Sequence, residues 1–152
     1  MLPHKINIRE AQESDIQEIQ FIRGSVKENV LSDPSRVTDE DCRVYLTQRG
    51  KGWVAEVGRS IIGFAIADLQ DSSIWALFIH PEFERRGIGK MLHHTMLDWY
   101  FAQGKEWVWL STDPNTRAEE FYARQGWQST KVLPNGEVKF EMTVNAWKAR
   151  GL

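Results

Sequence analysis

A strand, a charged loop and a helix follow one another near the middle of the chain, and this segment constrains the fold most. An apolar run at residues 74–79 leads into a charged loop at residues 82–86, and Gly87 and Gly89 then open an amphipathic helical pattern. The first N–H groups of a helix have no intrahelical partner, and the helix dipole favours negative charge there. Residues 85–90 are therefore predicted to bind a phosphate-bearing ligand. The basic side chains in this segment are Arg85, Arg86 and Lys90.

Two familiar phosphate-binding loops do not fit this spacing. The Walker A loop needs Gly-x4-Gly-Lys-Ser/Thr, and aligning it on Gly89 places Glu84 at the first glycine and Met91 at the hydroxyl. The dinucleotide fingerprint Gly-x-Gly-x-x-Gly places Leu92 where a small residue is required. Taken alone, the two glycines are also compatible with a plain tight turn into a helix, or with a nucleotide site of another kind.

A third pattern fits better. Residues 84–89, Glu-Arg-Arg-Gly-Ile-Gly, resemble the acetyl-coenzyme A (acetyl-CoA) signature of the GNAT N-acetyltransferases, Gln/Arg-x-x-Gly-x-Gly/Ala. Glu84 stands where the family usually has Gln or Arg, but a backbone cradle depends on the glycines and the helix start. A second family motif, Asn-x-x-Ala-x-x-Phe-Tyr-x-x-x-Gly-Phe/Trp, resembles residues 115–127. Its matching positions are Asn115, Ala118, Phe121, Tyr122, Gly126 and Trp127.

Hydrophobic periodicity predicts a layout that agrees with this resemblance. Residues 74–79 are apolar on both faces, so this strand is expected to lie centrally in a sheet. The other predicted strands are residues 5–9, 53–57, 61–68, 107–111, 127–133 and 138–144. One predicted helix begins at Ser14, and three others cover residues 38–48, 87–103 and 116–125.

The alternation of these elements predicts an α/β fold, with a mixed, mostly antiparallel sheet of about seven strands flanked by helices on both faces. The resemblance to GNAT enzymes implies the same order, with a V-shaped opening between the fourth and fifth strands, residues 74–79 and 107–111. A chain of 152 residues is expected to form a single domain over residues 1–152.

The resemblance also implies where acetyl-CoA is bound. The backbone N–H groups and basic side chains of residues 85–90 would hold its phosphates, and a backbone N–H near Phe78 or Ile79 would donate to the thioester carbonyl. Asn115 would contact the donor at the start of its helix, and Tyr122 would supply a proton to the departing thiolate. The expected donor-binding residues are Phe78, Ile79, Arg85, Arg86, Gly87, Ile88, Gly89, Lys90, Asn115 and Tyr122.

Asn115 and Tyr122 each have a second interpretation. They are seven residues apart, so a helix would place them on one face, about 10 Å apart along its axis. Tyr122 is also compatible with a core aromatic beside Phe121, and Asn115 with a plain helix N-cap. The two interpretations of Asn115 are compatible with each other.

The general base is not readable from the sequence. Family members often use a glutamate on the central strand, but residues 74–79 contain no carboxylate. Glu28 is the preferred candidate, because the region around residues 23–34 walls the acceptor site in the family. Asp33, Asp68 and Asp113 are alternatives, and all four are also compatible with surface or capping roles. Glu28 and Asp33 would suit a cationic acceptor.

Composition narrows the partners and the compartment. The net charge of −2 gives no basic field for nucleic acid, and no apolar run is long enough to span a membrane. The single cysteine, Cys42, excludes an intrachain disulfide, indicates a reducing, cytoplasmic location, and is expected to be a core residue. His93 and His94 are expected to be exposed or half-exposed, and no metal site is predicted because no cluster of ligands has the required spacing.

Together these features favour an N-acetyltransferase that uses acetyl-CoA as co-substrate. Direct attack in a ternary complex is expected, because neither motif contains a cysteine that could carry an acyl group. The acceptor would be a primary amine on a small molecule or a peptide, and the protein could form a homodimer. The alternative hypothesis is a non-catalytic acyl-CoA-binding module with the same fold.

Overall fold

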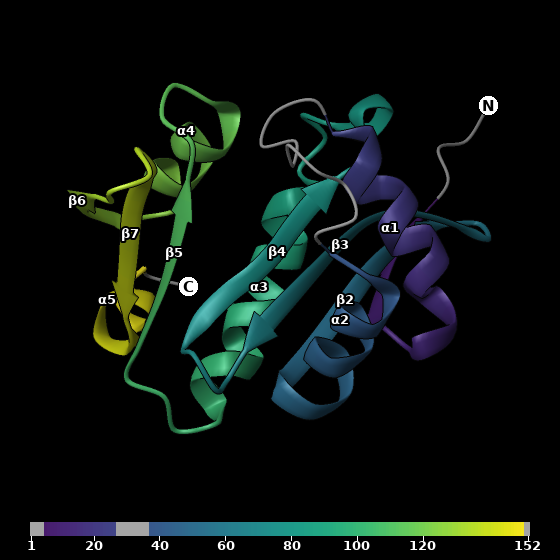
Figure 1. Cartoon of the computed structure of the whole chain (residues 1–152), viewed down its shortest axis with the longest axis horizontal. Helices are drawn as coiled ribbons and strands as arrows, with labels where there is room; N and C mark the ends of the chain where they lie inside the picture. Colours follow the sequence, from purple (N-terminus) through teal and green to yellow (C-terminus); the bar gives the residue numbers. More distant parts are fainter. Residues whose placement is uncertain (1–4, 27–36, 151–152) are drawn as a thin grey trace.

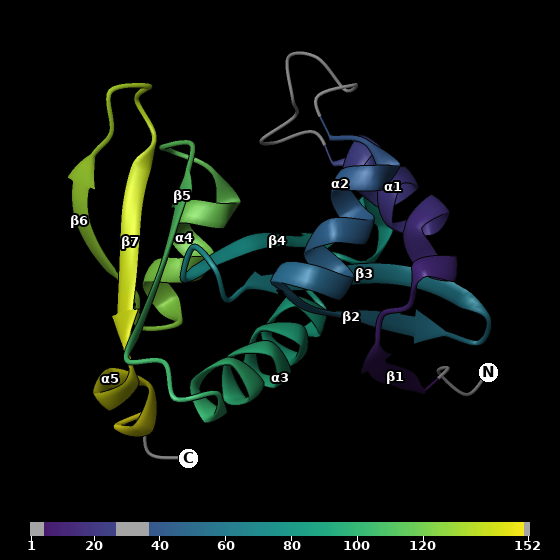
Figure 2. The ribbon, with the colours of Figure 1, turned by 60° about the horizontal axis from the view of Figure 1, so that its bottom comes forward.

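A twisted mixed sheet with helices on both faces forms the protein (Figures 1 and 2). The computed structural model describes residues 5–26 and 37–150, and within them the strands are ordered β1-β2-β3-β4-β5-β7-β6. Neighbouring strands are antiparallel except β4 and β5. The strands are β1 (Ile6–Glu10), β2 (Gly50–Val57), β3 (Ser60–Asp68), β4 (Ser73–Ile79), β5 (Trp107–Thr112), β6 (Gln128–Val132) and β7 (Val138–Thr143).

The helices divide between the two faces of the sheet (Figure 2). One core cluster joins α1 and α2 to β3 and β4, and a second joins α3 and α4 to the other face. The helices are α1 (Ile16–Ser25), α2 (Asp39–Val44), α3 (Ile88–Ala102), α4 (Arg117–Arg124) and α5 (Val144–Lys148), with short turns η1 (Glu13–Asp15), η3 (Tyr45–Arg49) and η4 (Pro81–Phe83). The predicted fold class is therefore confirmed, and Cys42 is fully buried as expected.

Among the element boundaries that differ from the prediction, two have identifiable reasons. Strand β2 begins at Gly50 and not at Trp53, and glycine permits this pairing with β3 because a Cβ there would lie only 1.8 Å from the backbone oxygen of Ala67. The last strand ends at Thr143, whose Oγ1 accepts the N–H of Ala146 at 3.1 Å and starts α5. The sequence pattern had extended this strand by one residue and did not indicate α5.

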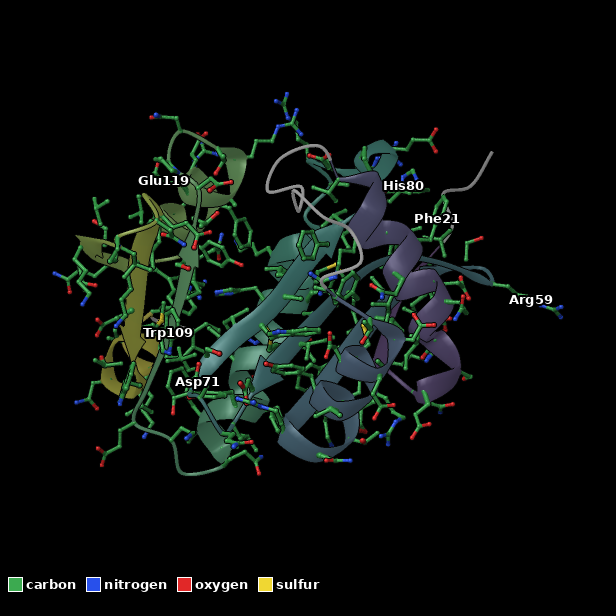
Figure 3. The ribbon with its side chains drawn as sticks, viewed as in Figure 1. Phe21, Arg59, Asp71, His80, Trp109 and Glu119 are labelled. Atoms are coloured by element: carbon green, nitrogen blue, oxygen red, sulfur yellow. The ribbon has the colours of Figure 1, made fainter. Side chains whose placement is uncertain are left out.

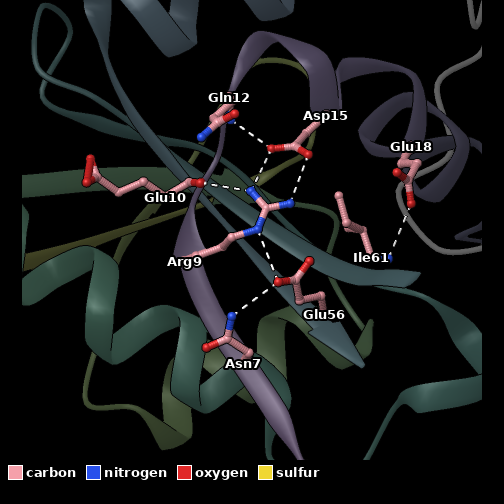
Figure 4. A network of polar contacts seen from close by, with 8 residues as sticks. All are labelled: Asn7, Arg9, Glu10, Gln12, Asp15, Glu18, Glu56 and Ile61. Carbon is pink, nitrogen blue, oxygen red and sulfur yellow. Dashed lines mark hydrogen bonds and ion pairs between the residues drawn. The ribbon is translucent and has the colours of Figure 1, made fainter. Parts of the chain in front are cut away.

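An ion-pair network fixes the start of the first helix (Figure 4). Arg9 donates to both carboxylate oxygens of Asp15 at 2.9 and 3.0 Å, and its Nε lies 3.2 Å from Glu56 Oε1. Asp15 also accepts the N–H of Gln12 at 2.8 Å. Burial opposes ionisation of Asp15, but the bonds from Arg9 and Gln12 outweigh it and hold the pKa of the carboxyl below its usual value. The helix therefore begins after Asp15 and not at Ser14 as predicted.

His93 is fully buried, which contradicts the expectation that it is exposed or half-exposed. Its Nε2 accepts the indole N–H of Trp127 at 2.8 Å, and the rings of Phe121 and Trp147 lie 5.7 Å away. Burial lowers the pKa of His93 to about 3, so the ring is neutral at physiological pH. The expectation failed because the burial of His93 depends on contacts with Trp127 and Trp147, which are remote in sequence.

The buried neutral His93 predicts a specific acid sensitivity. In the unfolded chain this histidine binds a proton below its ordinary pKa of about 6.5, whereas in the folded chain it does so only near 3. The contribution of the neutral, buried ring to the free energy of unfolding is present above pH 6.5 and is lost as the pH falls below that value. Between pH 7.5 and 5 the wild type should lose about 2 kcal/mol of unfolding free energy relative to His93→Gln, which retains an acceptor for Trp127. Urea unfolding at several pH values measures this difference, and parallel curves for the two proteins would contradict it.

Candidate active site

Strands β4 and β5 touch at one end and then separate (Figure 1). Their single pairing is Ser73 with Trp109, whereas β4 pairs with β3 along its length. Trp109 secures the closed end, since its backbone N–H donates to Ser72 at 3.0 Å and its indole N–H donates to the Asp71 carbonyl at 3.0 Å (Figure 3). Beyond Ser73, the edge of β4 that faces β5 has no strand partner among the described residues. This parting of β4 and β5 is the opening that the sequence placed between residues 74–79 and 107–111.

The register of β4 decides which backbone groups face the parting. The N–H of His80 donates to the Ile62 carbonyl on β3 at 2.8 Å. Alternation along an antiparallel pair then directs the N–H of Phe78, opposite Phe64, toward β3. Ile79, opposite Gly63, directs its N–H away from β3 and toward the parting. Of the two residues expected to donate to a thioester carbonyl, Ile79 therefore has the free N–H.

The loop before α3 forms a concave run of backbone amides, residues 85–90, which we call the amide cradle. Arg85 and Gly87 have positive φ angles of 64° and 81°, and Gly87 is the N-cap of α3. The first backbone bond of the helix runs from the N–H of Met91 to the Gly87 carbonyl at 3.1 Å. Among the described residues, the cradle N–H groups have no backbone acceptor. Alternating backbone conformations at a helix N-terminus produce the arrangement that binds phosphate.

Side chains around the amide cradle add charge and connect it to α4. The Arg86 guanidinium lies over the Phe83 ring at 5.2 Å. Glu84, the residue that departs from the GNAT signature, forms an ion pair with Arg117 at the start of α4. Lys90 and Gly87 border a surface hollow of about 390 Å³ along the outer face of α3. The ion pair of Glu84 with Arg117 therefore links the first motif, which follows β4, to the second motif, which follows β5.

Tyr122 lies within an aromatic cluster between α3, α4 and β7. Its ring is 5.5 Å from Trp127, 6.3 Å from His93 and 6.3 Å from Phe140. Burial raises the pKa of its phenol well above the ordinary value, so the hydroxyl remains protonated. Within the described chain this hydroxyl has no hydrogen-bond partner, and its oxygen is not fully enclosed by the protein. The hydroxyl is therefore available to a ligand, although the ring itself packs as a core aromatic.

Comparisons with known proteins agree with this geometry. The sequence profile of the Acetyltransferase (GNAT) family matches residues 15–127. The chain belongs to the GNAT acetyltransferase family. No curated protein matches it in sequence.

Several solved structures share the fold of this GNAT protein. The paia N-acetyltransferase of Thermoplasma acidophilum, solved with coenzyme A, has a TM-score of 0.78 and 18% identity over 91% of this chain and 99% of that one. The ribosomal-protein-S18-alanine N-acetyltransferase of Escherichia coli has a TM-score of 0.75 and 14% identity over 92% and 94%. The yncA protein of Salmonella typhimurium, solved with acetyl-CoA, has a TM-score of 0.75 and 15% identity over 91% and 94%.

Asn115 occupies a different place in the GNAT structure from the one that its motif suggested. It precedes α4 with a positive φ of 61°, and its backbone N–H donates to Glu119 Oε1 at 2.8 Å. The N-cap of α4 is Thr116, whose Oγ1 accepts the N–H of Glu119 at 3.2 Å. Asn115 therefore does not share a helix face with Tyr122, and the N-cap interpretation of Asn115 is wrong. It lines a hollow of about 620 Å³ that also includes Ser129 and Phe140.

The described residues narrow the search for a general base. Glu28, the preferred candidate, and Asp33 lie outside the described residues. Asp68 is buried at the end of β3, beside Ser73 and far along the sheet from Ile79. Arg49 donates to both of its carboxylate oxygens at 2.7 and 3.1 Å, so Asp68 has a structural role. His80 accepts the N–H of Glu82 at Nδ1 at 3.1 Å, so that ring nitrogen is engaged in the turn that follows β4.

Two further findings concern the described residues as a set. No three histidine, cysteine, aspartate or glutamate side chains among them gather closely enough to hold a metal ion. None of their helices combines the length and the apolar character needed to cross a bilayer.

Sequence reasoning missed two features of the site. The first is that Phe121 packs against Gly89 of the amide cradle. Its ring edge lies 3.6 Å from the position that a Cβ on Gly89 would occupy, and the Ile79 side chain lies 3.7 Å from the same point. The strained backbone of Arg85 was not foreseen either, because an arginine gives no sequence signal for a positive φ. A glycine at position 85 would have provided that signal.

The strain at Arg85 predicts opposite effects for two neighbouring substitutions. Arg85→Gly should raise the unfolding free energy by about 0.5–1 kcal/mol, because glycine adopts a positive φ without the steric cost. Arg86→Gly should lower it by about 0.5–1 kcal/mol, because Arg86 does not have a positive φ and glycine adds backbone entropy to the unfolded chain. Urea unfolding of both variants measures the effects, and changes of the same sign would contradict the assignment of strain to Arg85.

Proposed function

We propose that this GNAT protein transfers the acetyl group of acetyl-CoA to a primary amine by direct attack in a ternary complex. The observation that carries the proposal is the parting of β4 and β5 directly beside the amide cradle. A phosphate-bearing ligand held by the cradle can extend an amide-containing arm along the free edge of β4. The family supports acetyl transfer in general, and two of the structural relatives were solved with coenzyme A or acetyl-CoA.

The donor would be held by its phosphates and its carbonyl. The N–H groups of residues 85–90, together with the side chains of Arg85, Arg86 and Lys90, would bind the pyrophosphate. The N–H of Ile79 would donate to the thioester carbonyl, whose oxygen becomes negative as the amine attacks. A hydrogen-bond donor that faces this oxygen in a site without competing water stabilises the tetrahedral intermediate more than it stabilises the bound thioester.

Collapse of the intermediate needs a proton for the leaving sulfur. Tyr122 would donate it, since burial keeps its phenol protonated. The acceptor ammonium loses one proton before attack, and Glu28 is the candidate to accept it. The nitrogen loses a second proton when it becomes an amide, and this proton balances the one that Tyr122 gives to the sulfur. A lysine-like amine has a pKa of about 10.4, so such an acceptor must lose its proton before attack. No acyl-enzyme is formed, because the single cysteine, Cys42, lies on α2 and is fully buried in the core cluster that joins α2 to α1 and the sheet.

A first experiment separates catalysis from donor binding alone. Calorimetric titration of the purified chain with coenzyme A and acetyl-CoA should show binding, and Arg85→Gly should bind more weakly although it is more stable. Release of free thiol from acetyl-CoA should then depend on an added amine. Binding without turnover on a broad amine panel would favour a non-catalytic acyl-CoA module, and no binding at all would contradict the amide cradle.

A second prediction concerns Tyr122. Tyr122→Phe removes only the hydroxyl and preserves the ring that packs against Trp127 and Phe140. Its turnover should fall by roughly tenfold to a hundredfold or more, because proton transfer by a positioned side chain commonly contributes that much. Its affinity for acetyl-CoA and its melting temperature should stay close to those of the wild type. Unchanged turnover would show that Tyr122 is a core residue and that sulfur takes its proton elsewhere.

A further inference from the structure

The guanidinium of Arg23, near the end of α1, lies among aromatic rings of β3 and β4. Its Cζ atom is 4.9 Å from the centre of the Trp75 ring, 5.0 Å from that of Phe78 and 5.7 Å from that of Phe64. The Tyr45 ring stacks on Trp75 with 4.0 Å between centroids. Arg23, Trp75 and Phe78 are only partly buried. A planar cation is thus held in a fixed orientation by rings from both strands.

This cation has no counter-charge in the described chain. The Nε and Nη2 atoms of Arg23 are enclosed and make no hydrogen bond, and no acidic side chain there forms an ion pair with it. Cys42 is the nearby group that could carry negative charge, but burial raises the pKa of its thiol, so it is neutral. An enclosed charge without a partner is costly, and the rings offset only part of that cost. Nη1 is not among these enclosed atoms, so an anion that binds to it would supply the counter-charge that the described residues lack.

The position of Arg23 connects it to the proposed acyl-transfer point. Phe78, one of the rings around it, is joined through its own peptide bond to Ile79, whose N–H faces the parting of β4 and β5. Arg23 is on the face of the sheet covered by α1 and α2, whereas α3 and the amide cradle belong to the opposite face (Figure 2). A molecule that contacts Arg23 could therefore reach the acyl group from the side that the donor does not occupy.

We propose that Arg23 binds a carboxylate of the acceptor, so that the substrate is an amine with a carboxylate close to its reacting nitrogen, such as an amino acid. This inference rests on the proposed acetyl transfer and names the acceptor class for it. Nη1 is the donor that such a carboxylate would reach, a bond between a guanidinium N–H and a carboxylate is a strong charge-assisted one, and the aromatic rings limit the rotation of the guanidinium. The group recognised here is negative, whereas Glu28 and Asp33 in the sequence suggested recognition of a positive group.

Pairs of acceptors that differ only in the carboxylate test the proposal. Thiol release from acetyl-CoA is measured with L-leucine, L-methionine, L-phenylalanine and β-alanine, each against its carboxamide. The acid of at least one pair should be used with a kcat/KM roughly tenfold higher or more than its amide. The carboxylate makes the neighbouring ammonium harder to deprotonate, so a preference for the acid cannot arise from amine basicity.

Arg23→Met then assigns the preference to this side chain. The variant should lose the discrimination between acid and amide, while its activity on amides and its affinity for coenzyme A stay within about twofold of the wild type. Its melting temperature should stay level or rise, because an unpaired enclosed charge is replaced by an apolar chain of similar length. Arg59→Met is the matched control: Arg59 projects from the β2–β3 turn into solvent, and its variant should keep the discrimination (Figure 3).

The outcomes separate this inference from the proposed function. Turnover without a preference for acids, or a preference that survives Arg23→Met, would overturn the carboxylate site and leave acetyl transfer intact. A large fall in melting temperature of Arg23→Met would assign Arg23 to the fold and overturn the site too. A stronger preference for O-phosphoethanolamine than for any amino acid would replace carboxylate by phosphate. Absence of turnover with every amine would contradict the acetyl transfer itself, and titration of the chain with the same acids would then test Arg23 separately.

Discussion

The free edge of β4 is the constraint on which the rest of this structure depends. Backbone N–H and C=O groups in the middle of a sheet are almost always paired, so a strand that loses its neighbour needs another partner. Here the loss begins immediately after the Ser73–Trp109 pair. Each part of the sheet holds together without the missing pairs, because β4 pairs with β3 along its length apart from a bulge at Trp75, and β5 is fully paired with β7. The molecule can therefore keep a central opening without losing either half.

Two helices hold this opening at a fixed width. Helix α3 packs on β2, β3 and β4, and its Tyr100 hydroxyl donates to the Trp107 carbonyl at the start of β5 at 2.9 Å. Helix α4 follows β5 and meets α3 through the cluster of His93, Tyr122 and Trp127. Because His93 is neutral and accepts the Trp127 N–H, the orientation of these rings is set by packing and one hydrogen bond. The position of Tyr122 in the site is thus a consequence of the core.

The sequence predicted the layers of the fold because periodicity and turns are local properties. Residues 74–79 are apolar on both faces, which is sufficient to place them centrally, and the spacing of Gly87 and Gly89 is sufficient to locate the amide cradle. The failures involve properties that distant residues determine. The burial of His93 was missed because it depends on contacts with Trp127 and Trp147, which are remote in sequence. The positive φ of Asn115 reflects a loop that no motif specifies.

The two indications of acceptor charge differ in physical weight. Acidic residues are common in any protein, and water solvates them at little cost on a surface, so acidity read from a sequence says little about a partner. Within the described chain, Arg23 has two enclosed nitrogens without an acceptor and no counter-charge, and burial of a charge in that state carries a real desolvation cost. Sequence could not reveal this difference, because Arg23 looks like any basic residue at a helix C-terminus until Phe64, Trp75 and Phe78 are brought around it. A charge that the described residues leave without a counter-ion is therefore the stronger guide to the acceptor class proposed here.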